Sequence, residues 1–288
     1  MNEYDTVART ANATNNAKHQ GLRLDRWHMV RDSAWGVIEP RLPEDGRVCL
    51  VGAGSCDDLP LARIVERVGA AGSVDLVDFD ISSTDRALHR LPAEQRARVT
   101  VLADDVTGGS ADLVLRAARD RTPLPDALPL PYDALGAGEY DLVIGDMLYT
   151  QLLHAGMLAL DLPQPQQRAL MRRYDAPLTT ALVHRLQASA RPGGHVVHIH
   201  DLACWASAHA QLVTLDEALV DPCCAWERLR RHDACDPHLT LGRIGANVID
   251  TAWWRWPFEP NKHFLVRATV ARADVGASSE LGPIFRTS

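Results

Sequence analysis

The sequence lacks the features of a membrane or exported protein. It contains no run of about eighteen apolar residues, which is the length that a helix needs to cross a bilayer. The first twenty residues are polar, with Asn12, Asn15, Asn16 and Lys18, and they contain no apolar core of a secretory signal. From these absences we expect a cytoplasmic protein with no membrane partner.

Cysteine pairs of the C-x-x-C type are also missing. The chain has six cysteines, and without a signal peptide we expect no disulfides among them. Cysteine and histidine crowd one region, as Cys223, Cys224, His232, Cys235 and His238. Adjacent cysteines are awkward tetrahedral ligands and the spacing fits no common zinc module. We therefore predict no metal site there.

Excess positive charge is absent too. The 288 residues include 30 Lys and Arg against 37 Asp and Glu, a formal net charge of −7, which argues against nucleic acid as the main partner. Apolar residues make up 46% of the chain, enough for a sizeable core. We expect a globular protein, monomeric or homodimeric, whose partner is a small molecule or a peptide.

What the chain does contain is a regular alternation of strand-like and helix-like segments. Strands are predicted at 47–52, 73–79, 98–103, 140–145 and 194–200, and helices at 25–41, 58–69, 82–91, 109–120 and up to about 190, with interruptions at Pro163 and Pro165. The Arg191-Pro192-Gly193 run predicts a turn before the fifth strand. This alternation predicts a mostly parallel sheet with helices on both faces.

The C-terminal part differs, because 244–256 and 263–271 are two β-like runs with no helix between them. We expect them to form an antiparallel hairpin at one edge of the sheet. The predicted domains are an N-terminal helical lid with the helix leading into the first strand at 1–46, a main domain at 47–272 with a substrate-cap insertion near 147–175, and a tail at 273–288.

The most informative stretch is the glycine turn after the first strand. The apolar run Val48 to Val51 ends at Gly52-Ala53-Gly54, as in α/β sheets that bind nucleotide-like ligands. A dinucleotide site needs a third glycine three residues after Gly54, where this chain has Asp57. A carboxylate at the head of the next helix would also repel a pyrophosphate. The pattern therefore disfavours a nicotinamide dinucleotide.

From these residues onward the chain resembles the class I S-adenosylmethionine-dependent methyltransferases, over roughly residues 25–271. Val48 to Cys56 resembles the first motif of that family, although Cys56 replaces a small residue and apolar Leu50-Val51 replaces its opening acid. The resemblance implies a doubly wound, seven-stranded, mostly parallel Rossmann-like methyltransferase fold with S-adenosylmethionine as cofactor. The cofactor-binding residues that it implies are Gly52, Ala53, Gly54, Asp78, Phe79, Asp104, Asp105, Val106, Asp146 and Met147.

Within that resemblance, Asp78 is implied to bind the ribose hydroxyls and one of Asp104 and Asp105 the adenine amino group. Asp105, before Val106, fits the family pattern better than Asp104. Asp146 and Met147 are implied to lie beside the transferable methyl group. Asp57 and Asp58 we interpret as caps of the following helix.

Candidate catalytic residues lie at the carboxyl ends of the fourth and fifth strands. They are His200, Asp146 and Tyr149, of which His200 is the candidate base, whereas His198 on the same strand face is interpreted as a packed core residue. A metal held by Asp146, His200 and Asp201 lacks further carboxylates nearby and is not predicted. Candidate substrate-binding residues are Tyr4, Trp27, His28, Arg31, His154 and Trp254.

These observations together predict a methyltransferase that uses S-adenosylmethionine and acts on an oxygen or nitrogen of a small molecule or peptide. Two alternatives stay open. One is an NAD(P)-dependent oxidoreductase on a related sheet, and the other is a catalytically silent protein that binds the cofactor and serves in interactions.

Overall fold

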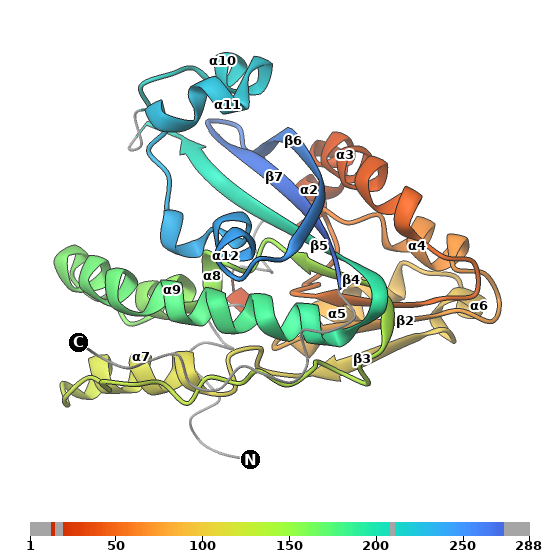
Figure 1. Ribbon diagram of the computed structural model, residues 1–288, viewed down its shortest axis with the longest axis horizontal. Coiled ribbons are helices and arrows are strands. Elements are labelled where there is room, and N and C mark those ends of the chain that lie inside the picture. Colours follow the sequence, from red (N-terminus) through yellow and green to blue (C-terminus); the bar gives the residue numbers. More distant parts are fainter. Residues whose placement is uncertain (1–12, 15–19, 208–210, 274–288) are drawn as a thin grey trace.

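A single seven-stranded sheet organises the molecule (Figure 1). The computed structural model describes residues 13–14, 20–207 and 211–273. The strand order is β3-β2-β1-β4-β5-β7-β6, in which β7 is antiparallel to its neighbours β5 and β6 and the other six strands run in one direction. The strands are β1 (Arg47–Val51), β2 (Ser73–Asp78), β3 (Val99–Ala103), β4 (Tyr140–Asp146), β5 (Ala190–Trp205), β6 (Asn247–Glu259) and β7 (Lys262–Arg272).

Helices cover both faces of this sheet. One face packs against α3, α4 and α5 and the other against α8, α9 and α12, so β1 is apolar on both sides and buried from Val48 to Val51. The helices are α2 (Gln20–Arg26), α3 (His28–Ile38), α4 (Leu61–Arg67), α5 (Ile81–His89), α6 (Ala93–Arg96), α7 (Ser110–Asp120), α8 (Gln151–Ala159), α9 (Gln164–Ser189), α10 (Leu215–Val220), α11 (Pro222–Ala225) and α12 (Pro237–Arg243), with 3-10 turns η2 (Glu39–Arg41), η3 (Trp226–Arg228) and η4 (Asp233–Cys235).

The predicted strands and the C-terminal hairpin are confirmed, with three differences of extent. The predicted helix 25–41 is divided at Trp27 into α2 and α3. Pro165 does not interrupt a helix but lies in the first turn of α9, where proline loses no intrahelical hydrogen bond. The predicted turn at Arg191-Pro192-Gly193 is instead the start of β5, where Gly193 donates its N–H to the carbonyl of Ala273, the residue after β7.

A separate, smaller core lies beyond the end of the main sheet. There β5, β6 and β7 extend past the other strands toward α10 and α11 (Figure 1). Leu202, Leu215, Ala218 and Leu265 are among its buried residues, and it shares none with the two clusters that flank the central strands. The helices that the structure describes include none that is both long and apolar enough to span a bilayer.

Candidate functional site

The glycine turn lies at the point where the strand order reverses. β1 is flanked by β2 on one side and β4 on the other, and ligands of open α/β sheets bind at such a reversal, beyond the carboxyl ends of the strands. Gly52 has a φ of +76°, and a Cβ there would lie 2.9 Å from the carbonyl oxygen of Asp146. Only glycine allows this turn and this close approach to the end of β4.

Asp78 ties the turn to the neighbouring strand β2. One of its carboxylate oxygens accepts the N–H of Gly54 at 2.7 Å, and the other accepts the N–H of Asp80 at 2.7 Å. Burial raises the pKa of Asp78, and the main-chain hydrogen bonds act in the opposite direction. Each oxygen keeps lone-pair capacity for a further donor. Phe79 follows directly and is partly buried.

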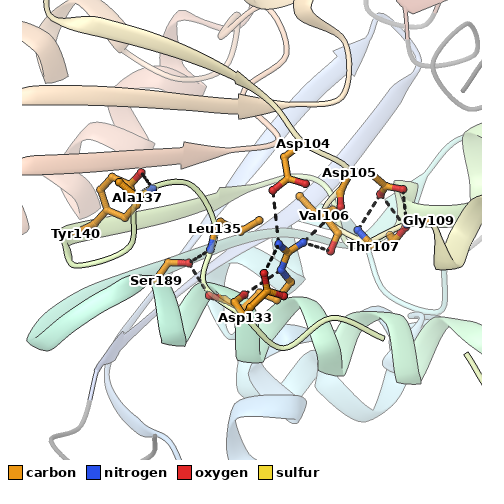
Figure 2. Close-up of polar contacts among 11 residues, drawn as sticks. Asp104, Asp105, Val106, Thr107, Gly109, Asp133, Leu135, Ala137, Tyr140 and Ser189 are labelled. Atoms are coloured by element: carbon orange, nitrogen blue, oxygen red, sulfur yellow. Dashed lines mark hydrogen bonds and ion pairs between the residues drawn. The ribbon is translucent and has the colours of Figure 1, made fainter. Parts of the chain in front are cut away.

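The two acids after β3 have different environments (Figure 2). Asp105 is used by its own turn: it accepts hydrogen bonds from the N–H of Thr107 at 2.8 Å, from the Thr107 hydroxyl at 2.7 Å and from the N–H of Gly109 at 2.8 Å. The Asp104 side chain is 37% exposed, and burial raises its pKa. This geometry favours Asp104 over Asp105 as the acid that faces a ligand, the reverse of the order that the sequence suggested.

A buried arginine that the sequence did not indicate holds this corner together. Arg185 of α9, 4% exposed, lies 3.5 Å from the Asp104 carboxylate and 3.7 Å from that of Asp133. It also donates to the carbonyls of Asp133 at 3.1 Å and Val106 at 3.0 Å, and Figure 2 shows these acceptors converging on one point. A guanidinium has five donors, so one side chain can fix both loops. Nothing in the local sequence distinguishes this arginine from a surface residue of α9.

On the other side of the turn, Asp146 at the end of β4 forms a carboxyl pair with Asp58. The two side chains share a hydrogen bond across the strand reversal. Burial, followed by the charge of Asp58, holds the pKa of Asp146 well above its usual range, and burial raises the pKa of Asp58 from 3.8 to about 6. Asp58 was interpreted as a helix cap, but its contact with Asp146 places its side chain at the candidate site.

Met147 follows Asp146 in a left-handed conformation, with a φ of +50°. This conformation costs a residue with a Cβ roughly 1–2 kcal/mol. Met147 is 4% exposed and donates its N–H to the Ile199 carbonyl at 3.0 Å. Backbone strain of this kind concentrates at functional sites.

The carboxyl pair predicts a pH-dependent stability. Because the folded-state pKa of Asp58 is raised, its stabilising contribution is complete below about pH 4 and is lost as the pH rises through about 6. We expect Asp58→Asn to be more stable than the wild type at neutral pH by about 1–3 kcal/mol. Urea unfolding between about pH 5 and about pH 8 measures this difference.

The neighbouring carboxylate supplies the control. Asp57 is 3% exposed, pairs with Arg90 at 2.8 Å and accepts the Ser55 hydroxyl at 2.7 Å, so Asp57→Asn is expected to destabilise the protein. If wild type and Asp58→Asn lost stability in parallel over this pH range, the carboxyl pair would not be what controls it.

Two of the three candidate catalytic residues are buried beside β5. The Tyr149 hydroxyl lies 2.6 Å from Nδ1 of His198, and its pKa is raised well above the usual range by burial. His200 is 1% exposed, and neither ring nitrogen has a hydrogen-bond partner among the residues that the structure describes. Burial lowers the pKa of His200 to about 4, so the ring is neutral and a weak base. This environment makes His200 a poorer general base than its sequence position suggested.

The candidate substrate residues are dispersed. Tyr4 lies outside the described residues. Trp27 is 3% exposed, packs on Trp256 at a ring distance of 5.1 Å, and donates its indole N–H to the Pro257 carbonyl at 3.0 Å. Trp254 is 6% exposed and belongs to the same core cluster. Both tryptophans are therefore core residues in this structure, which leaves no ring face to a substrate.

His28, Arg31 and His154 remain accessible. His28 is exposed, and it and Arg31 line a cavity of about 370 Å³ that also includes Cys56 of the glycine turn. Arg31 donates to the carbonyls of Asp57 at 2.6 Å and Leu24 at 2.5 Å, so it fixes the approach to the turn. His154 lies on α8 and is exposed to solvent.

Comparison with known proteins adds similar structures but no close relative. The chain matches no known family profile and no curated protein. It is similar to a SAM-dependent methyltransferase from Aquifex aeolicus, with 15% identity, a TM-score of 0.46, and coverage of 92% of this chain and 98% of that chain. It is also similar to a Bordetella parapertussis protein described as exported, with 14% identity, a TM-score of 0.46, and coverage of 87% and 67%.

A third similar structure is fibrillarin from Aeropyrum pernix in complex with natively bound S-adenosyl-L-methionine, with 14% identity, a TM-score of 0.43, and coverage of 84% of this chain and 76% of that chain. At such identities and scores these likenesses identify neither a ligand nor a substrate. The fold follows from the strand order and the strand directions of the chain itself. The chain has the Rossmann-like methyltransferase fold, a seven-stranded, mostly parallel sheet closed by an antiparallel hairpin, that the resemblance to class I enzymes implied.

Proposed function

We propose that this protein binds S-adenosylmethionine and transfers its methyl group to an oxygen or nitrogen of a small molecule or peptide. The observation that carries the proposal is the hydrogen bond from the Gly54 N–H to Asp78 at the strand reversal. This hydrogen bond holds a carboxylate beside a turn of small residues, where a ribose with an attached amino-acid group could approach the main chain. Asp57, at the position of the third glycine, is buried and paired with Arg90. The start of the following helix is therefore not available to bind a pyrophosphate.

Each part of the cofactor has a proposed partner. The turn Gly52-Ala53-Gly54 would lie along the methionine part of the cofactor. Asp78 and Phe79 would contact the ribose, and Asp104 and Val106 would contact the adenine. Asp146 and Met147 would lie beside the sulfonium. The Asp58–Asp146 pair would supply negative charge to the sulfonium and ammonium groups, which are both cationic.

The reaction needs alignment more than acid–base power. The acceptor atom attacks the methyl carbon in line with the departing sulfur, so a new carbon–oxygen or carbon–nitrogen bond forms as the carbon–sulfur bond breaks. If the acceptor carries a proton, Asp146 is the proposed base. Burial and the charge of Asp58 raise the pKa of Asp146, which makes its carboxylate a stronger base than an exposed one. His200 is a weaker candidate because its pKa is low.

Calorimetry with S-adenosylhomocysteine and with NAD tests the proposal. We expect measurable binding of S-adenosylhomocysteine and none of NAD at the same concentrations. Tighter binding of NAD would overturn the proposal in favour of an NAD(P)-dependent oxidoreductase. Binding of S-adenosylhomocysteine without methyl transfer to any acceptor in a panel of hydroxyl, amine and peptide compounds would instead favour the silent interaction protein.

We further propose the cytoplasm as the location and a monomer or homodimer as the working form, without nucleic acid or membrane as partner. The net charge of −7 supports the absence of nucleic acid. Size-exclusion chromatography with light scattering distinguishes monomer from dimer.

A further inference from the structure

A second group of reactive side chains lies on α9, where η4 packs against the helix. Asp175 lies on α9, His232 immediately precedes η4, and Cys235 is the last residue of η4. One donor atom from each lies within 4.8 Å of those of the other two, and Nε2 of His232 is 2.6 Å from an Asp175 carboxylate oxygen. The Asp175 side chain is 5% exposed and Cys235 is 1% exposed. These residues have no part in the proposed methyl transfer.

The donor set is one that zinc prefers. A thiolate, an imidazole and a carboxylate each bind Zn²⁺ at about 2.0–2.3 Å, so a tetrahedral ion needs donor atoms about 3.3–3.8 Å apart. The three donor atoms already lie within 4.8 Å of one another, so a small rearrangement of the side chains would bring all three onto one ion. A thiolate and a carboxylate carry two negative charges, which a divalent cation neutralises in a buried place.

Thr179 gives a second, independent indication. It lies four residues after Asp175 on α9, hence on the same helix face, and it is fully buried. Its hydroxyl lies against the Cys235 sulfur and has no other hydrogen-bond partner in the described part of the chain. A hydroxyl donor to a metal-bound thiolate is a common supporting contact at such sites.

We propose that Asp175, His232 and Cys235 bind a divalent cation of the zinc type, with the fourth position open to water or to another ligand. Binding displaces the proton of the Cys235 thiol, which is released to solvent. The site takes two of its three donors, His232 and Cys235, from the cysteine- and histidine-rich region of the sequence and the third, Asp175, from α9. Cys223 and Cys224 are exposed, and the His238 ring lies 3.3 Å from the Thr269 hydroxyl.

Metal binding to the full-length protein tests this inference without reference to methyl transfer. After chelator treatment, we expect one equivalent of Zn²⁺ to bind and one equivalent of Co²⁺ to give a thiolate-to-cobalt charge-transfer band. Cys235→Ser should abolish that band and weaken Zn²⁺ binding by at least about 100-fold, and Thr179→Ala should weaken it by about 10-fold with the band retained. Circular dichroism verifies that each variant is folded.

Cys224→Ser is the matched control, because it removes an exposed cysteine from the same region of the sequence. It should change neither the cobalt charge-transfer band nor the affinity for Zn²⁺. The inference is overturned if the wild type binds no equivalent of Zn²⁺ or Co²⁺, or if Cys235→Ser keeps the band. It is equally overturned if Cys224→Ser abolishes the band. His232→Ala is the second ligand variant. If Cys235→Ser does not fold, loss of Zn²⁺ binding in folded His232→Ala supports the site and retention overturns it.

Discussion

Asp78→Ala is expected to weaken S-adenosylhomocysteine binding by about 100-fold or more. Two hydroxyl hydrogen bonds to a carboxylate are each worth about 1.5–3 kcal/mol, and about 2.7 kcal/mol is already a factor of 100. The variant also removes the acceptor that holds the Gly54 N–H at 2.7 Å, so the turn itself loses its link to β2. Isothermal titration calorimetry of wild type and variant measures the change.

Two further variants separate ligand contact from general damage. Asp78→Asn keeps the shape and one acceptor oxygen, so we expect a loss of about 10-fold. Asp75→Asn alters a carboxylate on the same strand that accepts the Tyr140 hydroxyl at 2.5 Å, away from the turn, and should leave the affinity within about twofold. Unchanged affinity in a folded Asp78→Ala protein would show that the ribose assignment is incorrect.

Arg267→Met is expected to lower the free energy of unfolding by about 3–5 kcal/mol, which is the usual effect of leaving one buried charge without its partner. Arg267 and Asp236 form an ion pair and are 3% and 0% exposed. The guanidinium also lies 4.9 Å from the Trp226 ring and 5.1 Å from the Trp253 ring. The strand β7 and the start of α12 are therefore joined by a charge pair surrounded by aromatic rings.

Urea unfolding of four proteins tests this prediction: wild type, Arg267→Met, Asp236→Asn and the double variant. The double variant should be less destabilised than the sum of the singles, because it leaves no unpaired charge. Arg63→Met is the exposed comparison, since Arg63 and Asp32 are 46% and 60% exposed, and it should cost less than about 1 kcal/mol. A loss below about 1 kcal/mol in Arg267→Met would mean that water reaches Asp236 and solvates it.

The main sheet could be predicted because its strands are short apolar runs separated by helices of regular period. β1, β2 and β4 begin within one residue of their expected starts, since burial on both faces leaves little choice of residue there. The outer half of β5 was missed because Asp201 and Cys204 interrupt its apolar run. No helix or strand was predicted in residues 206–243, because the helices there are of seven residues or fewer and lack a clear period.

In the candidate site, too, features set by neighbouring residues could be predicted from the sequence, and contacts between distant residues could not. The glycine turn and Asp78 could be identified because chain order places them at adjacent strand ends. Arg185 could not, because it binds a loop 80 residues earlier in the chain, and neither could the Asp58–Asp146 pair, whose members are 88 residues apart. The preference for Asp105 did not anticipate that its carboxylate accepts the N–H groups of a local turn, which the sequence leaves ambiguous.

The extension of β5 beyond β4 affects how the chain assembles during synthesis. β5 pairs with β4 only as far as Ile199, so His200 to Trp205 gain a strand partner only from β7, which begins at Lys262. At a synthesis rate of about 5–20 residues per second, this half-strand waits roughly 3–11 s for its neighbour. An unpaired apolar edge can join another chain during that interval. The risk of misassembly is therefore set by the time needed to synthesise residues 206–262, a kinetic quantity that the stability of the finished sheet does not reveal.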